Sequence, residues 1–198
     1  MRNVFVAICC FVFVLLTSGP ATAGVIESIT SGAAFTLHPS YVGQSFTTPA
    51  GGPWGNITFN FFSNASPATT PYAIGTAYLL SQVFAGTPAT LSPAAPGFIA
   101  ADTSIVGNVY VFGPSVILQP NTQYFLYSNA LFLAGSVTGA PGGSGLYAAA
   151  YSNSSFIQEP ANANFALNGT AAPEPGSLSL LSLGMLAGLC KFVRRKAR

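Results

Sequence analysis

The sequence predicts an all-β fold: a single jelly-roll-like antiparallel β-sandwich, flanked by an N-terminal signal helix and a C-terminal transmembrane helix. Two observations predict the sandwich. Short segments rich in Phe, Tyr and Thr are separated by Pro- and Gly-rich turns, and no helical period of useful length occurs between the two ends. Many short strands with frequent turns are typical of sandwiches and jelly rolls.

The clearest strand is expected at residues 54–62, where Ile57, Phe59 and Phe61 fall on one face because side chains alternate along a strand. The other expected strands are 75–81, 108–112 and 123–128, with weaker ones at 43–48, 145–151 and 162–167.

The N-terminus has the three parts of an export signal. Arg2 is the positive residue, residues 4–16 are an uncharged apolar run, and Ala21-Thr22-Ala23 fits the A-x-A pattern of signal peptidase. We expect residues 1–23 to be a signal peptide that is cut after Ala23, so that Gly24 becomes the new N-terminus. The alternative is an uncleaved membrane anchor.

The C-terminus, residues 173–198, has the organisation of a sorting tail. Pro173-Glu174-Pro175 precedes an apolar segment, 177–193, that would span about 25 Å as a helix, near the lower limit for crossing a bilayer. Basic residues favour the cytoplasmic side and would set the topology; they are Lys191, Arg194, Arg195, Lys196 and Arg198. The alternative is a buried core helix with a basic end.

The charge distribution separates the two ends from the body, residues 24–172. All six Lys and Arg residues lie in the ends, and the body carries only Glu27, Asp102 and Glu159, for a formal charge of about −3. Because nucleic-acid binding needs Lys and Arg to displace counterions, the composition excludes that function. All three cysteines also lie in the ends, so the body must be stabilised by burial without disulfides.

The ordered tail at 173–198, paired with an export signal, resembles the PEP-CTERM proteins of bacteria. The resemblance implies recognition by an exosortase, a membrane transpeptidase that cuts near the Pro-Glu-Pro motif after transient anchoring in the inner membrane. It also implies that the body lies outside the cytoplasm and ends at the cell surface or in an extracellular matrix, often with exopolysaccharide or biofilm.

The body carries a second resemblance. Gln44-Ser45-Phe46-Thr47, residues 96–100 and residues 116–125 are similar to segments of choice-of-anchor and carbohydrate-binding-like β-sandwiches. This likeness implies a fold more than a function, and it maps no active site onto the chain.

The sequence contains no convincing catalytic constellation, and we expect neither an enzyme nor a cofactor. The body acids are far apart in sequence, and His38 precedes Pro39 without a nucleophile motif nearby. No cluster has the spacing of metal ligands, although a structural calcium on Asp102 is an alternative. A hydrolase is the least favoured reading.

The functional expectation is an exported structural protein of the cell surface or matrix. The alternative is a carbohydrate-binding module for exopolysaccharide, because aromatic faces bind neutral sugars without formal charge. Trp54 is the candidate sugar contact, since it follows Gly51-Gly52-Pro53 and is expected at a rim of the sandwich. An aromatic residue on a strand is more often part of the core.

Overall fold

The computed structural model describes residues 23–29, 41–62, 71–131, 136–138, 147–150, 154–159 and 161–171. All of these lie within one compact unit, Ala23–Ala171. In this part of the chain no helix has the length and apolarity that crossing a membrane requires. The predicted signal helix and the predicted transmembrane helix lie outside the described residues, so both stay predictions.

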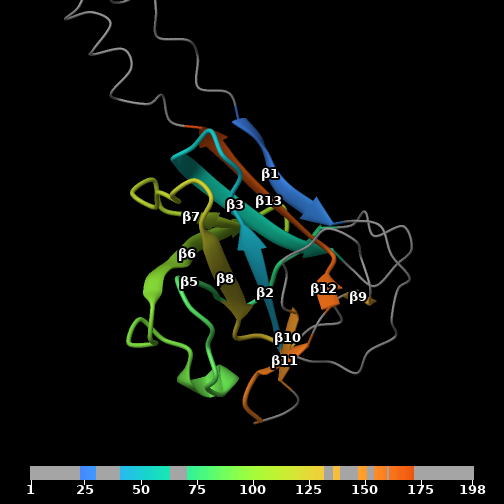
Figure 1. The fold of residues 1–198 in the computed structure, drawn as a ribbon. Coiled ribbons are helices and arrows are strands. Elements are labelled where there is room, and N and C mark those ends of the chain that lie inside the picture. The colour runs from blue at the N-terminus through green and yellow to red at the C-terminus, as the bar shows by residue number, and fades with distance from the viewer. Residues whose placement is uncertain are drawn as a thin grey trace, which may run out of the picture. The chain divides into compact units, whose positions relative to one another are not determined.

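The described residues form an all-β, antiparallel fold (Figure 1). The strands are β1 (Ala23–Ile29), β2 (Tyr41–Thr47), β3 (Trp54–Phe62), β4 (Pro71–Tyr72), β5 (Ala77–Leu80), β6 (Phe98–Val106), β7 (Val109–Phe112), β8 (Gln123–Ser128), β9 (Ser136–Thr138), β10 (Tyr147–Ala150), β11 (Ile157–Glu159), β12 (Ala161–Ala163) and β13 (Phe165–Ala171). The predicted all-β class is therefore confirmed.

One sheet contains most of the strands, in the order β1-β13-β3-β7-β6-β5-β8-β2-β10-β11, with β4 beside β3. Strands β12 and β9 form a separate pair. The last strand, β13, is not at an edge, because it lies between β1 and β3. The C-terminal end of the body is thus held by hydrogen bonds on both sides.

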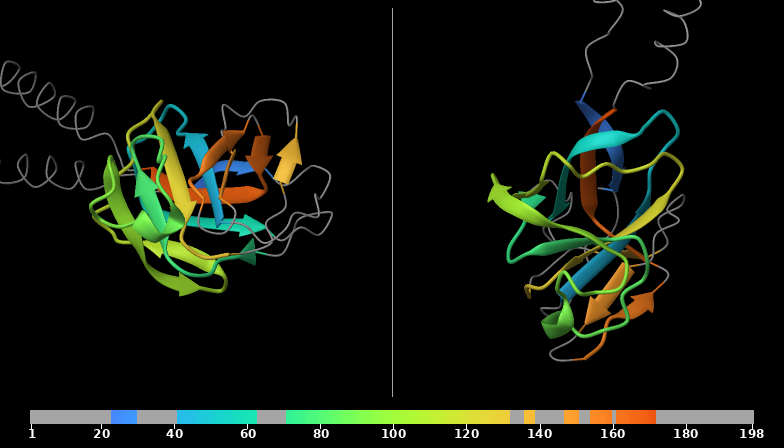
Figure 2. Two further views of the ribbon diagram at one scale, coloured as in Figure 1. Left: turned by 90° about the horizontal axis from the view of Figure 1, so that it is seen from below. Right: turned by 90° about the vertical axis from the view of Figure 1, so that its left-hand side faces the viewer.

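Strand β6 folds the sheet back on itself. Its first half pairs with β5, where Ala101 is opposite Tyr78, and its second half pairs with β7, where Asp102 is opposite Phe112. The two halves of the sheet then curve around a common core (Figure 2). The structure therefore has one continuous, folded-over sheet, and the finer jelly-roll sandwich stays a prediction.

The main core is built from aromatic rings of both halves of the sheet. The Phe59 ring stacks on Phe165 at a centroid distance of 5.4 Å and meets Phe61 edge-on at 4.9 Å. Phe46 from β2 reaches the same cluster, 6.4 Å from Phe59. Ile57, Phe59 and Phe61 are all buried, so the face predicted for residues 54–62 is confirmed.

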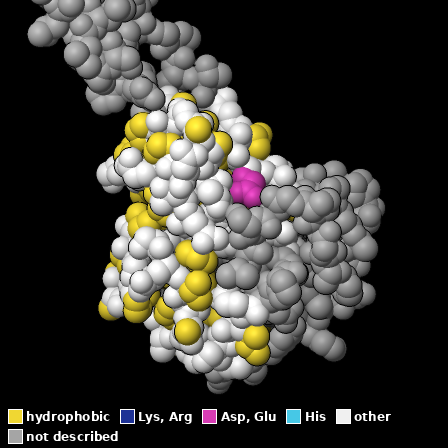
Figure 3. Space-filling view, viewed as in Figure 1, with side chains coloured by type: hydrophobic (Ala, Val, Ile, Leu, Met, Phe, Trp, Pro, Cys, Tyr) yellow, Lys and Arg dark blue, Asp and Glu magenta, His cyan; other side chains and the backbone are white. Residues whose placement is uncertain are grey.

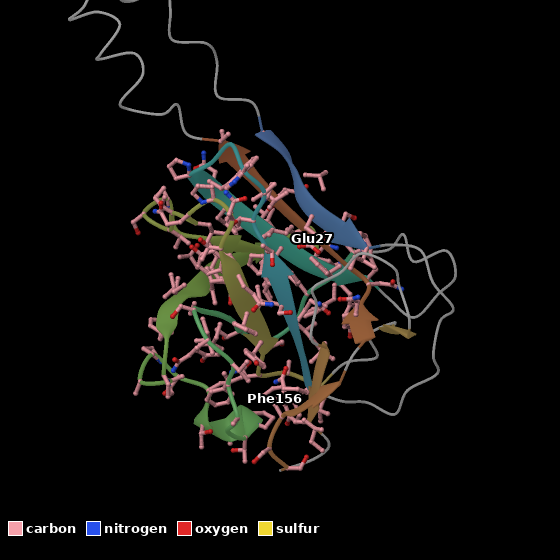
Figure 4. All side chains as sticks on the ribbon, viewed as in Figure 1. Glu27 and Phe156 are labelled. Carbon is pink, nitrogen blue, oxygen red and sulfur yellow. The ribbon has the colours of Figure 1, made fainter. Side chains whose placement is uncertain are left out.

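A second, smaller core covers the other face of β5 and β8. Tyr127 and Phe125 meet Phe84 from the β5–β6 connection, which also contains a short 3-10 helix, Pro88–Thr90. Phe156, labelled in Figure 4, closes this cluster with its ring 4.9 Å from that of Tyr127. This part of the sheet is therefore buried on both faces.

The strand predictions differ from the structure in one divided strand and in several strands that were not predicted. Residues 54–62 and 123–128 match β3 and β8, but the expected strand at 162–167 is divided at Asn164 into β12 and β13. Strands β1, β4, β6, β9 and β11 were not predicted. Strands β1 and β6 carry exposed positions on a sheet edge or a corner, where the alternation that marks a half-buried strand is weak.

Candidate functional site

The register of β1 on β13 brings both predicted processing positions to one end of the body. Ala23, the predicted last residue of the signal peptide, lies opposite Thr170, and Ala171 lies opposite Trp54 on β3. Pro173 follows two residues after β13 ends. Figure 1 shows the start of β1 beside the end of β13.

We call this end of the body the tail-end rim, and define it by the start of β1, the end of β13 and the loops 49–54 and 113–122. Paired backbone bonds join the two loops: the Trp54 N–H donates to Leu118 O and the Leu118 N–H to Trp54 O, each at 2.8 Å. The buried Thr48 hydroxyl donates to Gln119 O and accepts the Thr122 N–H at 3.0 Å. These bonds fix the loops to the sheet.

Trp54, the predicted sugar contact, is the first residue of β3 and is half-buried against the main core. Its indole lies over Gly52, where a Cβ atom would come within 2.3 Å of the ring. The indole N–H donates to Pro49 O at 3.4 Å. The ring is therefore held by its own loop, and a contact with sugar stays a prediction.

The predicted signal-peptide junction falls within β1. Ala23 is the first residue of the strand, and Gly24 lies opposite Gly169 on β13. Cleavage after Ala23 would leave Gly24 at the head of β1 with its strand partner retained. Ala21 lies outside the described residues.

Glu27 is turned inward by an irregularity in β1. The register on β13 shifts between Val25 and Glu27, and the carboxylate then accepts the N–H of Thr47 on β2 at 3.2 Å (Figure 4). Burial raises the pKa of Glu27 above its ordinary value of 4.5, and the bond from Thr47 acts in the opposite direction. Glu27 thus connects two distant strands.

Asp102 has a comparable structural role at the fold-over of β6. Its Oδ1 accepts the N–H of Ala77 at 2.7 Å, at the start of β5. Burial raises the pKa of Asp102 above 3.8, against the lowering effect of the backbone bonds. One of its two carboxylate oxygens is therefore engaged by β5, and the calcium alternative stays a prediction.

Two buried tyrosines use their hydroxyl groups to hold loops. The Tyr110 hydroxyl donates to Ile74 O at 2.6 Å and accepts the Ile74 N–H at 3.0 Å. The Tyr127 hydroxyl accepts the N–H of Phe84 at 3.0 Å. Burial raises the pKa of both tyrosines, so neither is poised as a base near neutral pH.

Gln44 is a structural residue whose role the sequence did not reveal. It is 1% exposed, and its Nε2 donates to Ser45 O at 2.7 Å and to Asn162 Oδ1 at 3.0 Å. Its Oε1 accepts the N–H of Ala163 at 2.7 Å. The amide therefore joins β2 to β12, and the only signal in the sequence was a polar residue at a core position.

The side-chain amide of Asn164 differs from that of Gln44 in its hydrogen bonding. Asn164 lies between β12 and β13 with no exposure, and neither its Oδ1 nor its Nδ2 has a hydrogen-bond partner among the described residues. Its backbone carbonyl accepts the N–H of Phe62 at 2.8 Å. The backbone of Asn164 is paired, while its side chain bears the cost of burial without compensation.

These groups do not form a catalytic arrangement. Glu27 and Asp102 each accept a backbone N–H on a different strand. His38 lies outside the described residues, and nothing is described of the Glu159 side chain. Within the described ranges, no three His, Cys, Asp or Glu residues are grouped as a metal site would require.

The surface agrees with the charge count. All six Lys and Arg residues lie outside the described part of the chain, and the coloured, described atoms in Figure 3 are white and yellow except for one small acidic spot. The residues predicted for sorting and topology are also outside it: Pro173, Glu174, Pro175, Lys191, Arg194, Arg195, Lys196 and Arg198. Their individual roles stay predictions.

Comparison with known proteins identifies the tail. No curated protein and no solved structure matches the chain, so the likeness of the body to carbohydrate-binding-like sandwiches stays a prediction. Residues 171–196 match the PEP-CTERM protein-sorting motif. The match confirms the predicted motif and indicates an exported protein whose membrane-anchored precursor is processed by an exosortase.

Proposed function

We propose that this protein is a structural component of the cell surface or of an extracellular, exopolysaccharide-containing matrix such as a biofilm. A signal peptidase removes residues 1–23, the tail anchors the precursor transiently in the inner membrane, and the exosortase then cuts near Pro173-Glu174-Pro175. The observation that carries the proposal is the sorting motif, which begins at Ala171, the last residue of β13.

The internal use of polar groups supports a role without catalysis. The carboxylates of Glu27 and Asp102 and the hydroxyls of Tyr110 and Tyr127 all bond to backbone groups of the body. A general acid or base must instead present its proton to a substrate. These four polar groups thus hold strands and loops of the body together.

Sorting is tested by following the tail in the native host. In a strain without exosortase, and in a Glu174→Ala variant, we expect the tail to remain attached and the protein to stay in the membrane fraction. Glu159→Ala is the matched control, because it removes a carboxylate of the body and should leave processing intact. An unchanged mature mass and location in the exosortase-deficient strain would contradict the proposal.

The alternative function is a carbohydrate-binding module that recognises exopolysaccharide. The half-exposed Trp54 at the tail-end rim favours it, since indole faces bind sugar rings. Retention of the mature protein on polysaccharide from its own host would support this function. Trp54→Ala should then abolish retention and Trp54→Phe should weaken it; no retention of the mature wild-type protein would eliminate the alternative.

A further inference from the structure

A short stretch of chain connects the tail-end rim to the apolar segment of the tail. Strand β13 is paired to its last residue, Ala171, which lies opposite Trp54. Residues 172–176 separate it from the apolar segment that starts at Ser177. About six steps of at most about 3.6 Å give the chain a reach of roughly 22 Å. The headgroup layer alone is about 5–7 Å thick, so a tail inserted up to Ser177 would limit how far Ala171 can lie from the bilayer surface.

The rim offers an apolar and uncharged surface at that position. Its two loops, 49–54 and 113–122, contain no Asp, Glu, Lys, Arg or His. Ile117 is 43% exposed, and further apolar side chains of the two loops are exposed or half-exposed: Pro49, Ala50, Pro53, Trp54 and Pro114. Hydrophobic side chains are visible at this end of the body in Figure 3.

The exposure of these side chains is built into the fold. The paired bonds between Trp54 and Leu118 hold the two loops together, and Thr48 ties the second loop to the sheet through Gln119 and Thr122. Because Leu118 and Val116 fill the core beneath the loop, Ile117 between them is directed away from it. The loops are therefore not free to turn their apolar residues inward.

We propose that the tail-end rim is a lipid-contact surface that lies in the interface of the bilayer while the tail is attached. The inference rests on the proposed function, because it needs the tail to be inserted. Tryptophan favours the interface between headgroups and acyl chains, and an uncharged loop enters that layer without giving up the hydration of an ion. The ligand is the interface of a neutral lipid bilayer.

The absence of positive charge sets this surface apart from polybasic membrane-binding patches. Residues 24–172 have no Lys or Arg, so anionic lipid adds no attraction and salt should have little effect on the contact. So few apolar side chains bind weakly by themselves. The tail raises their effective concentration at the bilayer, and removal of the tail by the exosortase would therefore also end the lipid contact.

Trp54 reports directly on this contact, because it is the only tryptophan of the chain. The full precursor is produced in a host without exosortase and reconstituted into phosphatidylcholine vesicles. The lipid is brominated either near the headgroup or near the end of the acyl chains. We expect loss of Trp54 fluorescence with the shallow bromines and little loss with the deep ones. Ile117→Ser should reduce the quenching.

A second single-tryptophan protein is the matched control. Trp54→Phe combined with Val83→Trp moves the reporter to the exposed loop between β5 and β6, which lies far from the start of β1 in Figure 1. This reporter should not be quenched by either lipid. Equal quenching of both reporters would mean that the body contacts lipid without preference for the rim, and would overturn the inference.

The anchoring by the tail and the lipid contact of the rim are tested by different measurements. Protection of the tail from added protease shows whether it is inserted; a tail that does not insert in any vesicle contradicts the proposed anchoring. An inserted tail with unquenched Trp54 overturns the lipid contact alone. Quenching that appears only when exosortase is added would mean that the enzyme, and not the tail, brings the rim to the lipid, and it also counts against the inference.

Discussion

The carboxylate of Glu27 on β1 accepts a hydrogen bond from the backbone N–H of Thr47 on β2, with 3.2 Å between oxygen and nitrogen. Strand β1 begins the strand order, whereas β2 lies near its other end. Strand β10 pairs with β2 only from Tyr41 to Gln44, so Thr47 lies beyond that pairing. The Glu27 side chain thus connects two strands of the sheet that do not pair with each other.

The free energy of unfolding of the body should fall as pH rises, whereas carboxyl groups with lowered pKa values make it rise. Burial raises the pKa of Glu27 and of Asp102, so the folded body binds more protons than the unfolded chain between the ordinary and the raised values. The free energy of unfolding should be highest below the ordinary values of 4.5 and 3.8, and should fall as pH rises through the raised ones.

Urea unfolding of the mature protein between about pH 3.5 and pH 7 measures this dependence. Glu27→Gln is the informative variant, because its amide oxygen can still accept the Thr47 N–H but does not titrate. Its stability should change less with pH than that of the wild type. A wild-type stability that rises from pH 4 to pH 7 would contradict the assigned direction of both shifts.

Gln44→Leu should destabilise the body strongly. The substitution leaves Asn162 Oδ1 and the Ala163 N–H without the bonds that Gln44 supplies. Each buried polar group left unpaired costs about 1–3 kcal/mol, so we expect a loss of about 3 kcal/mol or more in the free energy of unfolding. Gln82→Leu, at an exposed position, is the control and should stay within about 0.5 kcal/mol. Equal effects would refute the role of Gln44.

Tyr110→Phe should loosen the loop before β5. The lost hydroxyl leaves the Ile74 N–H unpaired, while Ile74 O keeps its bond from Ser128 Oγ at 3.2 Å. We expect a loss of about 1–3 kcal/mol and faster hydrogen exchange at Ile74. Tyr78→Phe, at a half-buried position on β5, is the control. Unchanged exchange at Ile74 in Tyr110→Phe would show that other contacts hold the loop.

Asn164→Leu should stabilise the body or leave its stability unchanged. Leucine has nearly the shape of asparagine, and it removes the two buried polar atoms that lack partners. The expected change in the free energy of unfolding is between about zero and a gain of 2 kcal/mol. Asn162→Leu is the matched control and should be destabilising, because Asn162 bonds to Gln44. A loss in Asn164→Leu would mean that the amide has a partner in the native protein.

One part of the candidate site could be predicted from the sequence, and another part required the structure. The sorting motif was readable because it is a local order of residues at one end of the chain, and its match at 171–196 confirms it. The tail-end rim could not be predicted from the sequence, because it consists of residues around 23, 54, 118 and 171, which are far apart in the chain. Trp54 was expected at a rim from its preceding glycines and proline, but its neighbours there were not.

The sequence by itself determined the fold class and the clearest strands. Alternation has a period of two, and this is enough to locate β3 and β8 and to say that Phe59 faces the core. The period says which face a side chain takes and nothing about which strand lies beside it. Only the tertiary structure placed β13 between β1 and β3 and gave Glu27, Gln44 and Asn164 their different environments. Strand pairing depends on contacts between residues far apart in the chain, and local pattern carries no record of those contacts.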